Sequence, residues 1–413
     1  MRPPLNTDGT LPPTLPMGTP DVAYHLALRG RPLPVVFAFR FGGPAPSLEA
    51  VRARVAERAH RIPALRYRVA PDRKVLLRVD RIAVEQHVHE AWLSEDDAGG
   101  AGAVRLLLSR PMNVGERPTW DVWLVHGPEG DHTLCYRTDH TLQDGVGAAH
   151  TARALLDDNP EGGPAAHHRS WPTPRGLAGA IGDVAASFRP TAKPAFDGTS
   201  SGRTTACHAD TSLERLRAIG RAHGGTVNDV YLAALSHAVR TWHLKATGSP
   251  HPPLPVAVPM SVRAPGEECA PGNHMVVARL LLPCDETTPR QAFARVAART
   301  TRLRASRQRD GLNLLLAATP RAIGARIGTR LVNGSVVAGP ASSVNFGQAL
   351  VHQGLAARRA VVLSGLASGI RVLTTLTGHH DVACLTVVHD ESLATADELP
   401  DLWLAAVLEL ERA

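Results

Sequence analysis

Cysteine is scarce in this chain of 413 residues, and the spacing of the cysteines argues against both a disulfide framework and a zinc site. The five cysteines are scattered, and no two of them form a Cys-x-x-Cys pair. They are Cys135, Cys207, Cys269, Cys284 and Cys384. An odd, dispersed set fits reduced thiols rather than a disulfide framework or a zinc site. Reduced thiols favour a cytoplasmic protein. The two pairs of neighbouring histidines lack acids or cysteines at metal-ligand spacing, so we also expect no metal.

Aromatic residues are few as well, at 4%, whereas hydrophobic residues make up 44% of the chain. The cores are therefore expected to be aliphatic. The formal net charge of +7 suits an anionic partner but does not identify one. With so few aromatic side chains among the basic ones, and no recognisable reading motif, we expect no nucleic-acid binding.

Long apolar runs are absent, and no stretch reaches the length of a transmembrane segment. Residues 1–20 are rich in Pro, Gly and Thr and lack an apolar centre, so we expect a loose arm and no signal peptide. The chain also has no glycine-rich phosphate loop and no Gly-x-Ser-x-Gly elbow.

The chain is long enough for two domains of ordinary size. Strand-like and helix-like patterns occur on both sides of a Pro- and Gly-rich stretch. So long a stretch is not expected inside one compact domain. We therefore predict an N-terminal subdomain over residues 1–156, a crossover linker over 157–203 and a C-terminal subdomain over 204–413, each of them mixed α/β.

One stretch stands out, Asp-His-Thr-Leu-Gln-Asp-Gly from Asp139 to Gly145. It follows a predicted strand and precedes a predicted helix. The imidazole of His140 can face a cleft there while the strand holds its backbone. Asp144 is placed to pin the turn or to orient the ring, and Gly145 permits a backbone approach that a Cβ would forbid. A satisfied histidine in an ordinary turn would give the same pattern.

Three other features each have a functional and a structural interpretation. Arg263, at a strand end, could pair with a buried Asp144, although other arginines would serve as well. Asn273 could donate to an oxyanion or simply lie in a turn. The predicted helix over 290–309 carries seven arginines, which either face solvent or bind phosphates.

Five segments in a fixed order supply the context. They are Pro118–Trp123, Asp139–Gly145, Val227–Val230, Val258–Arg263 with the following Gly272-Asn273, and Ser342–Gly347. Together they resemble the bacterial wax ester synthase/diacylglycerol acyltransferase family. This family lies within the wider CoA-dependent acyltransferase superfamily, which includes nonribosomal peptide condensation domains.

The resemblance implies an α/β fold of two chloramphenicol-acetyltransferase-like subdomains. Each would be a mixed sheet with helices, and the two would form a V-shaped pair around a central tunnel. His140 would be the general base, taking the acceptor's proton and returning a proton to the leaving thiolate. Asn273 would stabilise the tetrahedral oxyanion. Asp144, paired with Arg263, would be structural, and Gly145 would keep the entrance open.

The sequence also departs from the family motif. Asp139 stands where the motif has its first histidine, which alters the charge beside His140 or selects another acceptor. Gln143 is the remaining motif neighbour. The Pro-Gly after the Ser342–Gly347 segment is absent, and the N-terminal portion is short. These departures favour specialised metabolism over storage-lipid synthesis.

The expected activity is transfer of an acyl group from acyl-CoA to a small alcohol or amine, with no cofactor besides the thioester co-substrate. A second possibility is a donor held by an acidic carrier protein, which would dock on the helix over 290–309. Three further possibilities are wax ester or triacylglycerol synthesis, a peripheral membrane lipid enzyme and a catalytically silent thioester-binding protein.

Overall fold

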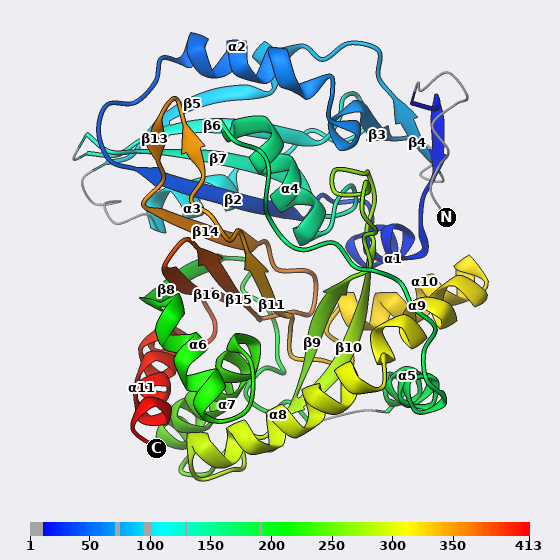
Figure 1. Cartoon of the computed structure of the whole chain (residues 1–413), viewed down its shortest axis with the longest axis vertical. Helices are drawn as coiled ribbons and strands as arrows, with labels where there is room; N and C mark the ends of the chain where they lie inside the picture. Colours follow the sequence, from blue (N-terminus) through cyan, green and yellow to red (C-terminus); the bar gives the residue numbers. More distant parts are fainter. Residues whose placement is uncertain (1–10, 71–74, 95–100, 129, 190–191) are drawn as a thin grey trace. The chain divides into compact units, whose positions relative to one another are not determined.

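A computed structural model describes residues 11–70, 75–94, 101–128, 130–189 and 192–413 (Figure 1). The chain forms two compact units, and each unit is built from three chain segments. Unit 1 contains the described residues up to His168, Arg263–His274 and Val344–Gly365. Unit 2 contains Arg169–Val262, Met275–Ser343 and Leu366–Ala413. The sequence predicted continuous halves, whereas the units exchange segments along the chain.

Unit 1 is built on a five-stranded mixed sheet in the order β14-β2-β7-β6-β5 (Figure 1). The strands are β14 (Arg359–Ser364), β2 (Pro34–Phe41), β7 (His132–Asp139), β6 (Trp120–His126) and β5 (Val88–Trp92). The β5–β6 pair is parallel and the other pairs are antiparallel. All eight residues of the central β7 are buried, so the turn that follows it starts from a fixed strand.

Period-two alternation decides which side chains of this sheet enter the main core of unit 1. Phe37, Phe39 and Phe41 of β2 lie on one face and pack with apolar residues of α2 (Leu48–Ala59) and α4 (Gly145–Leu156). On the opposite face, the buried Arg137 of β7 donates to carbonyls at the C-terminal end of α3 (Ala101–Ser109). Helices therefore cover both faces of the sheet.

The N-terminal part of the chain is more ordered than the sequence predicted. Residues 1–10 of the expected loose arm lie outside the described residues, but the rest of the arm is structured. Thr14–Pro16 form β1, which pairs with β4 (Val75–Arg78) in a three-stranded sheet completed by β3 (Tyr67–Val69). Helix α1 begins at Thr19 and ends at Leu28, with Pro20 in its first turn. The backbone N–H of Gly18 donates to the Asp21 carboxylate at 2.7 Å, which caps this helix.

Unit 2 contains a four-stranded sheet in the order β11-β15-β16-β8 and the antiparallel hairpin β9–β10. The strands are β8 (Thr204–Ser212), β9 (Leu254–Ser261), β10 (Met275–Leu282), β11 (Ala341–Asn345), β15 (Val372–His379) and β16 (Val382–Asp390). The helices are α5 (Pro174–Ala186), α6 (Leu213–Ala222), α7 (Val227–Thr247), α8 (Pro289–Ala305), α9 (Gln308–Ala318), α10 (Arg321–Val332) and α11 (Leu399–Arg412). Short elements complete the chain: η1 (Pro63–Arg66), η2 (Val84–Gln86), β12 (Val351–His352), β13 (Leu355–Ala356) and η4 (Ala396–Glu398).

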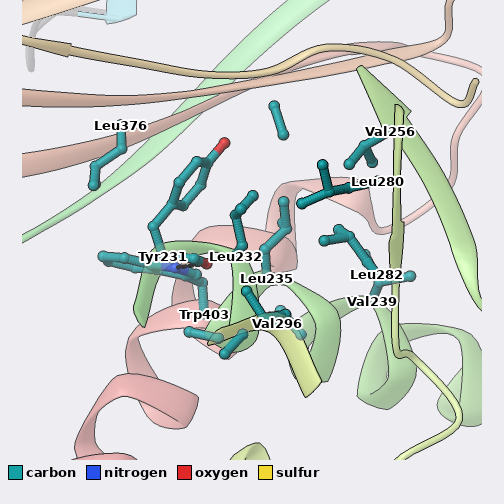
Figure 2. Packing of buried hydrophobic residues seen from close by; sticks show 14 of the residues in the cluster. Tyr231, Leu232, Leu235, Val239, Val256, Leu280, Leu282, Val296, Leu376 and Trp403 are labelled. Carbon is teal, nitrogen blue, oxygen red and sulfur yellow. Dashed lines mark hydrogen bonds between the residues drawn. The ribbon is translucent and has the colours of Figure 1, made fainter. Parts of the chain in front are cut away.

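The core of unit 2 gathers around α7. Figure 2 shows Tyr231 and Leu235 of this helix close to Val296 of α8 and Trp403 of α11. The Tyr231 hydroxyl lies 2.6 Å from that of Thr374, and the indole N–H of Trp403 donates to the Tyr231 carbonyl at 3.2 Å. The polar atoms of these two large aromatic side chains therefore have hydrogen-bond partners inside the core.

Part of the predicted crossover linker is a helix, α5. Thr173 caps it by accepting from the Gly176 N–H at 3.1 Å. A Cβ on Gly176 would lie 2.0 Å from the Ser306 carbonyl oxygen, so only glycine allows this approach. Glycine and proline are typical of loops, whereas here they start a helix and allow it to pack.

The α/β class predicted from the sequence is confirmed. Among the described residues, no helix combines the length and the apolarity needed to cross a membrane.

Candidate active site around His140

His140 lies at the end of β7, and backbone hydrogen bonds fix its position. Its N–H donates to the Leu33 carbonyl at 2.8 Å, and two residues later the Leu142 N–H donates to the Asp139 carbonyl at 2.8 Å. The side chain of Asp139 accepts from the backbone N–H groups of Leu33 at 3.0 Å and Thr141 at 3.2 Å. The Asp139 side chain therefore ties the turn after β7 to Leu33, which precedes β2.

The side-chain amide of Asn273 determines which nitrogen of His140 carries the proton. Its Nδ2 group donates to the His140 carbonyl at 2.7 Å and to Asp21 Oδ1 at 2.8 Å, so the amide nitrogen faces acceptors. Its Oδ1 then faces Nδ1 of His140 at 3.1 Å. Because Oδ1 can only accept, Nδ1 must donate. The neutral imidazole therefore has its free lone pair on Nε2.

Asp21 of α1 holds Asn273 in this orientation. Besides the amide, its Oδ1 accepts from the backbone N–H of Asn273 at 2.7 Å. Gly272 has a φ of +87°, and a Cβ there would lie 3.1 Å from Asp21 Oδ2, so glycine is needed for conformation and for space. Burial raises the pKa of Asp21 to about 6, although hydrogen bonds from Asn273 and Gly18 oppose the shift.

Tyr24, one turn further along α1, covers the ring of His140. The two rings are stacked with centroids 4.1 Å apart and planes 21° from parallel. The Tyr24 hydroxyl lies 3.1 Å from Nε2 of His140. The imidazole is thus held at both nitrogens, by Asn273 at Nδ1 and by Tyr24 at Nε2.

A buried ion pair holds the far end of the turn. Arg263 donates to Asp144 from Nε at 3.0 Å and from Nη2 at 2.6 Å, and both side chains are nearly inaccessible to solvent. The remaining Arg263 donors bond the carbonyls of Glu267, Ala270 and Gly272. Arg263 therefore also shapes the loop that carries Asn273.

Asp144 is at the same time the N-cap of α4. It accepts from the N–H groups of Gly147 and His274, both at 2.8 Å. Burial alone would raise the pKa of Asp144, but the charge and hydrogen bonds of Arg263, with these two N–H groups, hold it well below its usual range. Asp144 is therefore a permanent anion, suited to structure rather than to proton transfer.

The glycine that this ion pair requires is Gly147. A Cβ on Gly147 would lie 2.3 Å from Nη2 of Arg263, whereas a Cβ on Gly145 would have its nearest neighbour, in Val344, at 4.0 Å. Gln143 is buried, accepting from the Tyr136 hydroxyl at 2.7 Å and donating to Thr151 at 2.8 Å. It stabilises the turn from inside.

His140 itself is half-buried, and burial lowers its pKa, against opposing hydrogen bonds and the charge of Asp144. The imidazole is therefore neutral near pH 7, with Nε2 able to accept a proton. Within the described part of the chain, no group of three or more His, Cys, Asp or Glu side chains is arranged to hold a metal ion.

The structure thus brings together His140, Asp144, Arg263 and Asn273, which the sequence singled out. Two neighbours of the site, Asp21 and Tyr24, were missed. Gly18, Pro20 and Asp21 form a readable helix start, which could have revealed α1. Nothing in the sequence links Tyr24 to a histidine 116 residues further along the chain.

The fold has known relatives. It superimposes on the wax ester synthase/diacylglycerol acyltransferase of Marinobacter aquaeolei VT8 with a TM-score of 0.67 and 19% identity, covering 96% of this chain and 99% of that one. The starter condensation domain of rhizomide synthetase, as a mutant in complex with C8-CoA and Leu-SNAC, gives a TM-score of 0.62 and 15% identity over 97% and 93% of the two chains. The chain therefore has the fold that these two proteins share.

The sequence match is narrower and points to one family. Residues 35–182 match the wax ester synthase/diacylglycerol acyltransferase catalytic domain, which confirms the predicted resemblance to this family. A putative diacylglycerol O-acyltransferase of Mycobacterium tuberculosis is 26% identical over 281 residues, 56% of this chain and 59% of that protein. A probable diacylglycerol O-acyltransferase of the same organism is 25% identical over 345 residues, 73% of this chain and 72% of that protein. The chain thus aligns with little more than half the length of the first of these relatives.

Proposed function

We propose that this protein is an acyltransferase that moves an acyl group from a thioester to a hydroxyl or amine acceptor. One observation carries the proposal. The amide of Asn273 holds the proton of neutral His140 on Nδ1, so that the lone pair, which the Tyr24 hydroxyl contacts, lies on Nε2 and can take a proton. The match to an acyltransferase catalytic domain supports the reaction class.

The steps follow from that tautomer. Nε2 of His140 takes the proton of the acceptor as its oxygen or nitrogen attacks the thioester carbonyl, and a tetrahedral oxyanion forms. When this intermediate collapses, the carbon–sulfur bond breaks and Nε2 returns the proton to the thiolate. The imidazole ends as it began, and no covalent enzyme intermediate is needed.

The role of Asn273 in this mechanism is to position the base. The sequence suggested an oxyanion donor, but both amide hydrogens are engaged by Asp21 and the His140 carbonyl. An oxyanion would have to displace one of them. Asn273 is therefore proposed as the residue that fixes the tautomer and orientation of His140.

Acyl-CoA is the proposed donor, since a structural relative was crystallised with C8-CoA. A carrier-bound donor is the alternative, and the arginines of α8 were its basis. Three of them have acidic partners in unit 2: Arg295 with Glu286, Arg299 with Asp183 and Arg304 with Asp229. This pairing weakens the case for an acidic carrier docking there.

The acceptor is proposed to be a small alcohol or amine of specialised metabolism. Asp139 motivates this choice, because it replaces the first histidine of the motif and is buried one residue before the base. Wax ester or diacylglycerol acylation, named for the relatives, is the second candidate.

The test is thiol release from acyl-CoAs of increasing chain length in the presence of mixed alcohols and amines. Wild type, His140→Ala and His60→Ala are compared, because His60 is an exposed histidine of the same unit. We expect acceptor-dependent release that falls about 10²- to 10⁴-fold in His140→Ala and stays at the wild-type level in His60→Ala. Release that persists in His140→Ala would refute the base. Transfer only from a carrier-bound acyl group would favour the alternative donor.

A further inference from the structure

The hydroxyl of Tyr24, a residue of α1, lies next to the candidate base His140. It lies 3.1 Å from Nε2 of His140, the nitrogen that Asn273 leaves unprotonated. Since Nε2 has a lone pair and no hydrogen, the phenol is the donor in this contact. The contact is therefore made at the atom that would receive the acceptor's proton.

Ring stacking keeps the Tyr24 hydroxyl beside this nitrogen. The ring centroids are 4.1 Å apart and the planes are 21° from parallel, and the hydroxyl lies 3.1 Å from Nε2. An acceptor that gives its proton to Nε2 must take the place of this hydroxyl at the lone pair. An acceptor oxygen there, and the oxyanion that forms next to it, would lie beside the Tyr24 hydroxyl.

The oxyanion needs a hydrogen-bond donor, and Asn273 has its amide hydrogens engaged elsewhere. We propose that Tyr24 is a further catalytic residue, whose hydroxyl bonds Nε2 at rest and turns to the developing oxyanion when the acceptor attacks. This inference rests on the proposed acyltransfer and adds a residue to it.

The phenol must keep its hydrogen for this role. Burial raises the pKa of Tyr24, and the charge of Asp144 raises it further, so the hydroxyl stays neutral at any working pH. The acceptor's proton goes to Nε2 and then to the thiolate, and Tyr24 only donates a hydrogen bond. No proton or electron is left unbalanced.

The decisive variant is Tyr24→Phe, which keeps the stacked ring and removes only the hydroxyl. Tyr67→Phe is the matched control, because the Tyr67 hydroxyl donates to the Pro12 carbonyl at 2.7 Å in the same unit. We expect kcat to fall about 10²-fold in Tyr24→Phe, with the KM for the thioester little changed. Tyr67→Phe should keep the wild-type kcat. A wild-type kcat in Tyr24→Phe would overturn the proposal, even if Tyr24→Ala were impaired through loss of stacking.

A second readout does not depend on turnover. The ¹⁵N resonance of unprotonated Nε2 in His140 reports on hydrogen bonding to its lone pair, and it should move in Tyr24→Phe but not in Tyr67→Phe. An unchanged resonance would refute the contact and the proposal with it. Persistent thiol release in His140→Ala would instead refute the proposed general base, so the two failures are distinguishable.

Discussion

At the scale of single residues, the site depends on how the side chain of Asn273 is held. Its amide can present oxygen to His140 only because Asp21 and two carbonyls surround its nitrogen. The tautomer of the histidine is thus determined one step away, by a carboxylate that does not touch the ring. Which ring nitrogen of a histidine carries the proton is set in this way by the hydrogen bond that the ring makes.

Asn273→Ala tests this control. Nδ1 of His140 loses its acceptor, so the ring can rotate and populate the other tautomer. We expect kcat to fall about 10- to 100-fold, part of what a general base contributes, while the KM for the thioester changes little. Steady-state kinetics with Asn313→Ala, a partly exposed helix position in unit 2, as control would measure it. An unchanged kcat would show that the orientation of His140 is fixed without the amide.

Asp139 should leave a signature in the pH dependence of stability. Burial raises its pKa from 3.8 to about 6, against hydrogen bonds from Leu33 and Thr141. The folded state therefore binds this proton more tightly than the unfolded chain, and stability is lost as pH rises from about 4 to 6. Removing the group in Asp139→Asn should make that slope less negative by up to about 1.4 kcal/mol per pH unit.

Urea unfolding of unit 1 at several pH values between 4 and 7 measures the slope. Glu57→Gln, at an exposed position of α2, is the control variant. Equal slopes in Asp139→Asn and in the wild type would mean that Asp139 is not the group that titrates.

At the scale of elements, the Asp144–Arg263 ion pair limits the size of the side chains that the first turn of α4 can carry. Gly147→Ala would place a methyl group 2.3 Å from Arg263 Nη2 and force the Asp144–Arg263 pair apart. We expect a loss of about 1–3 kcal/mol in the free energy of unfolding, as for other overpacked sites. Gly145→Ala, two residues earlier on the same helix, has room and should cost little.

Thermal or urea unfolding of the two variants measures the difference. Equal stabilities would mean that Arg263 can move without cost. A loss confined to Gly145→Ala would instead assign the steric requirement to Gly145.

At the scale of the whole molecule, unit 1 is assembled from distant parts of the chain. Its edge strand β14 comes from residues 359–364, and the partner of Asp144 from Arg263. A fragment covering residues 1–168 would lack both, leaving the Asp144 carboxylate buried without its cation. We expect this fragment not to fold.

The fragment is compared with a chain in which residues 1–168, 263–274 and 344–365 are joined by flexible linkers. Dispersed amide resonances in the joined chain, and not in the fragment, are the expected result. Dispersed resonances in the fragment alone would show that the first segment is sufficient.

Sequence reasoning was most successful for the strand and the helix that flank the candidate site. The strand before His140 follows from the short run Thr133–Tyr136, and the helix after Asp144 follows from the small apolar residues repeated along α4. The pairing of Asp144 with Arg263 was one possibility among several arginines, and only the three-dimensional structure selects it. Whether Gly145 keeps an entrance open remains a prediction.

What could not be predicted has a physical cause. The N-terminal residues and α5 are rich in proline and glycine, which favour turns on average, and tertiary packing overrides that preference here. The exchange of segments between the units could not be predicted either, because the sequence of a strand does not show which sheet the strand will join.

The distance along the chain between His140 and Asn273 also has a consequence in time. The two residues are 133 positions apart, so at ribosomal rates of about 5–20 residues per second the histidine precedes its amide partner by roughly 7–27 s. During that interval the nascent chain contains the imidazole but nothing to select its tautomer. The hydrogen bond from Nδ1 of His140 to Asn273, which holds one tautomer, can therefore form only once the later segment has been synthesised and has docked.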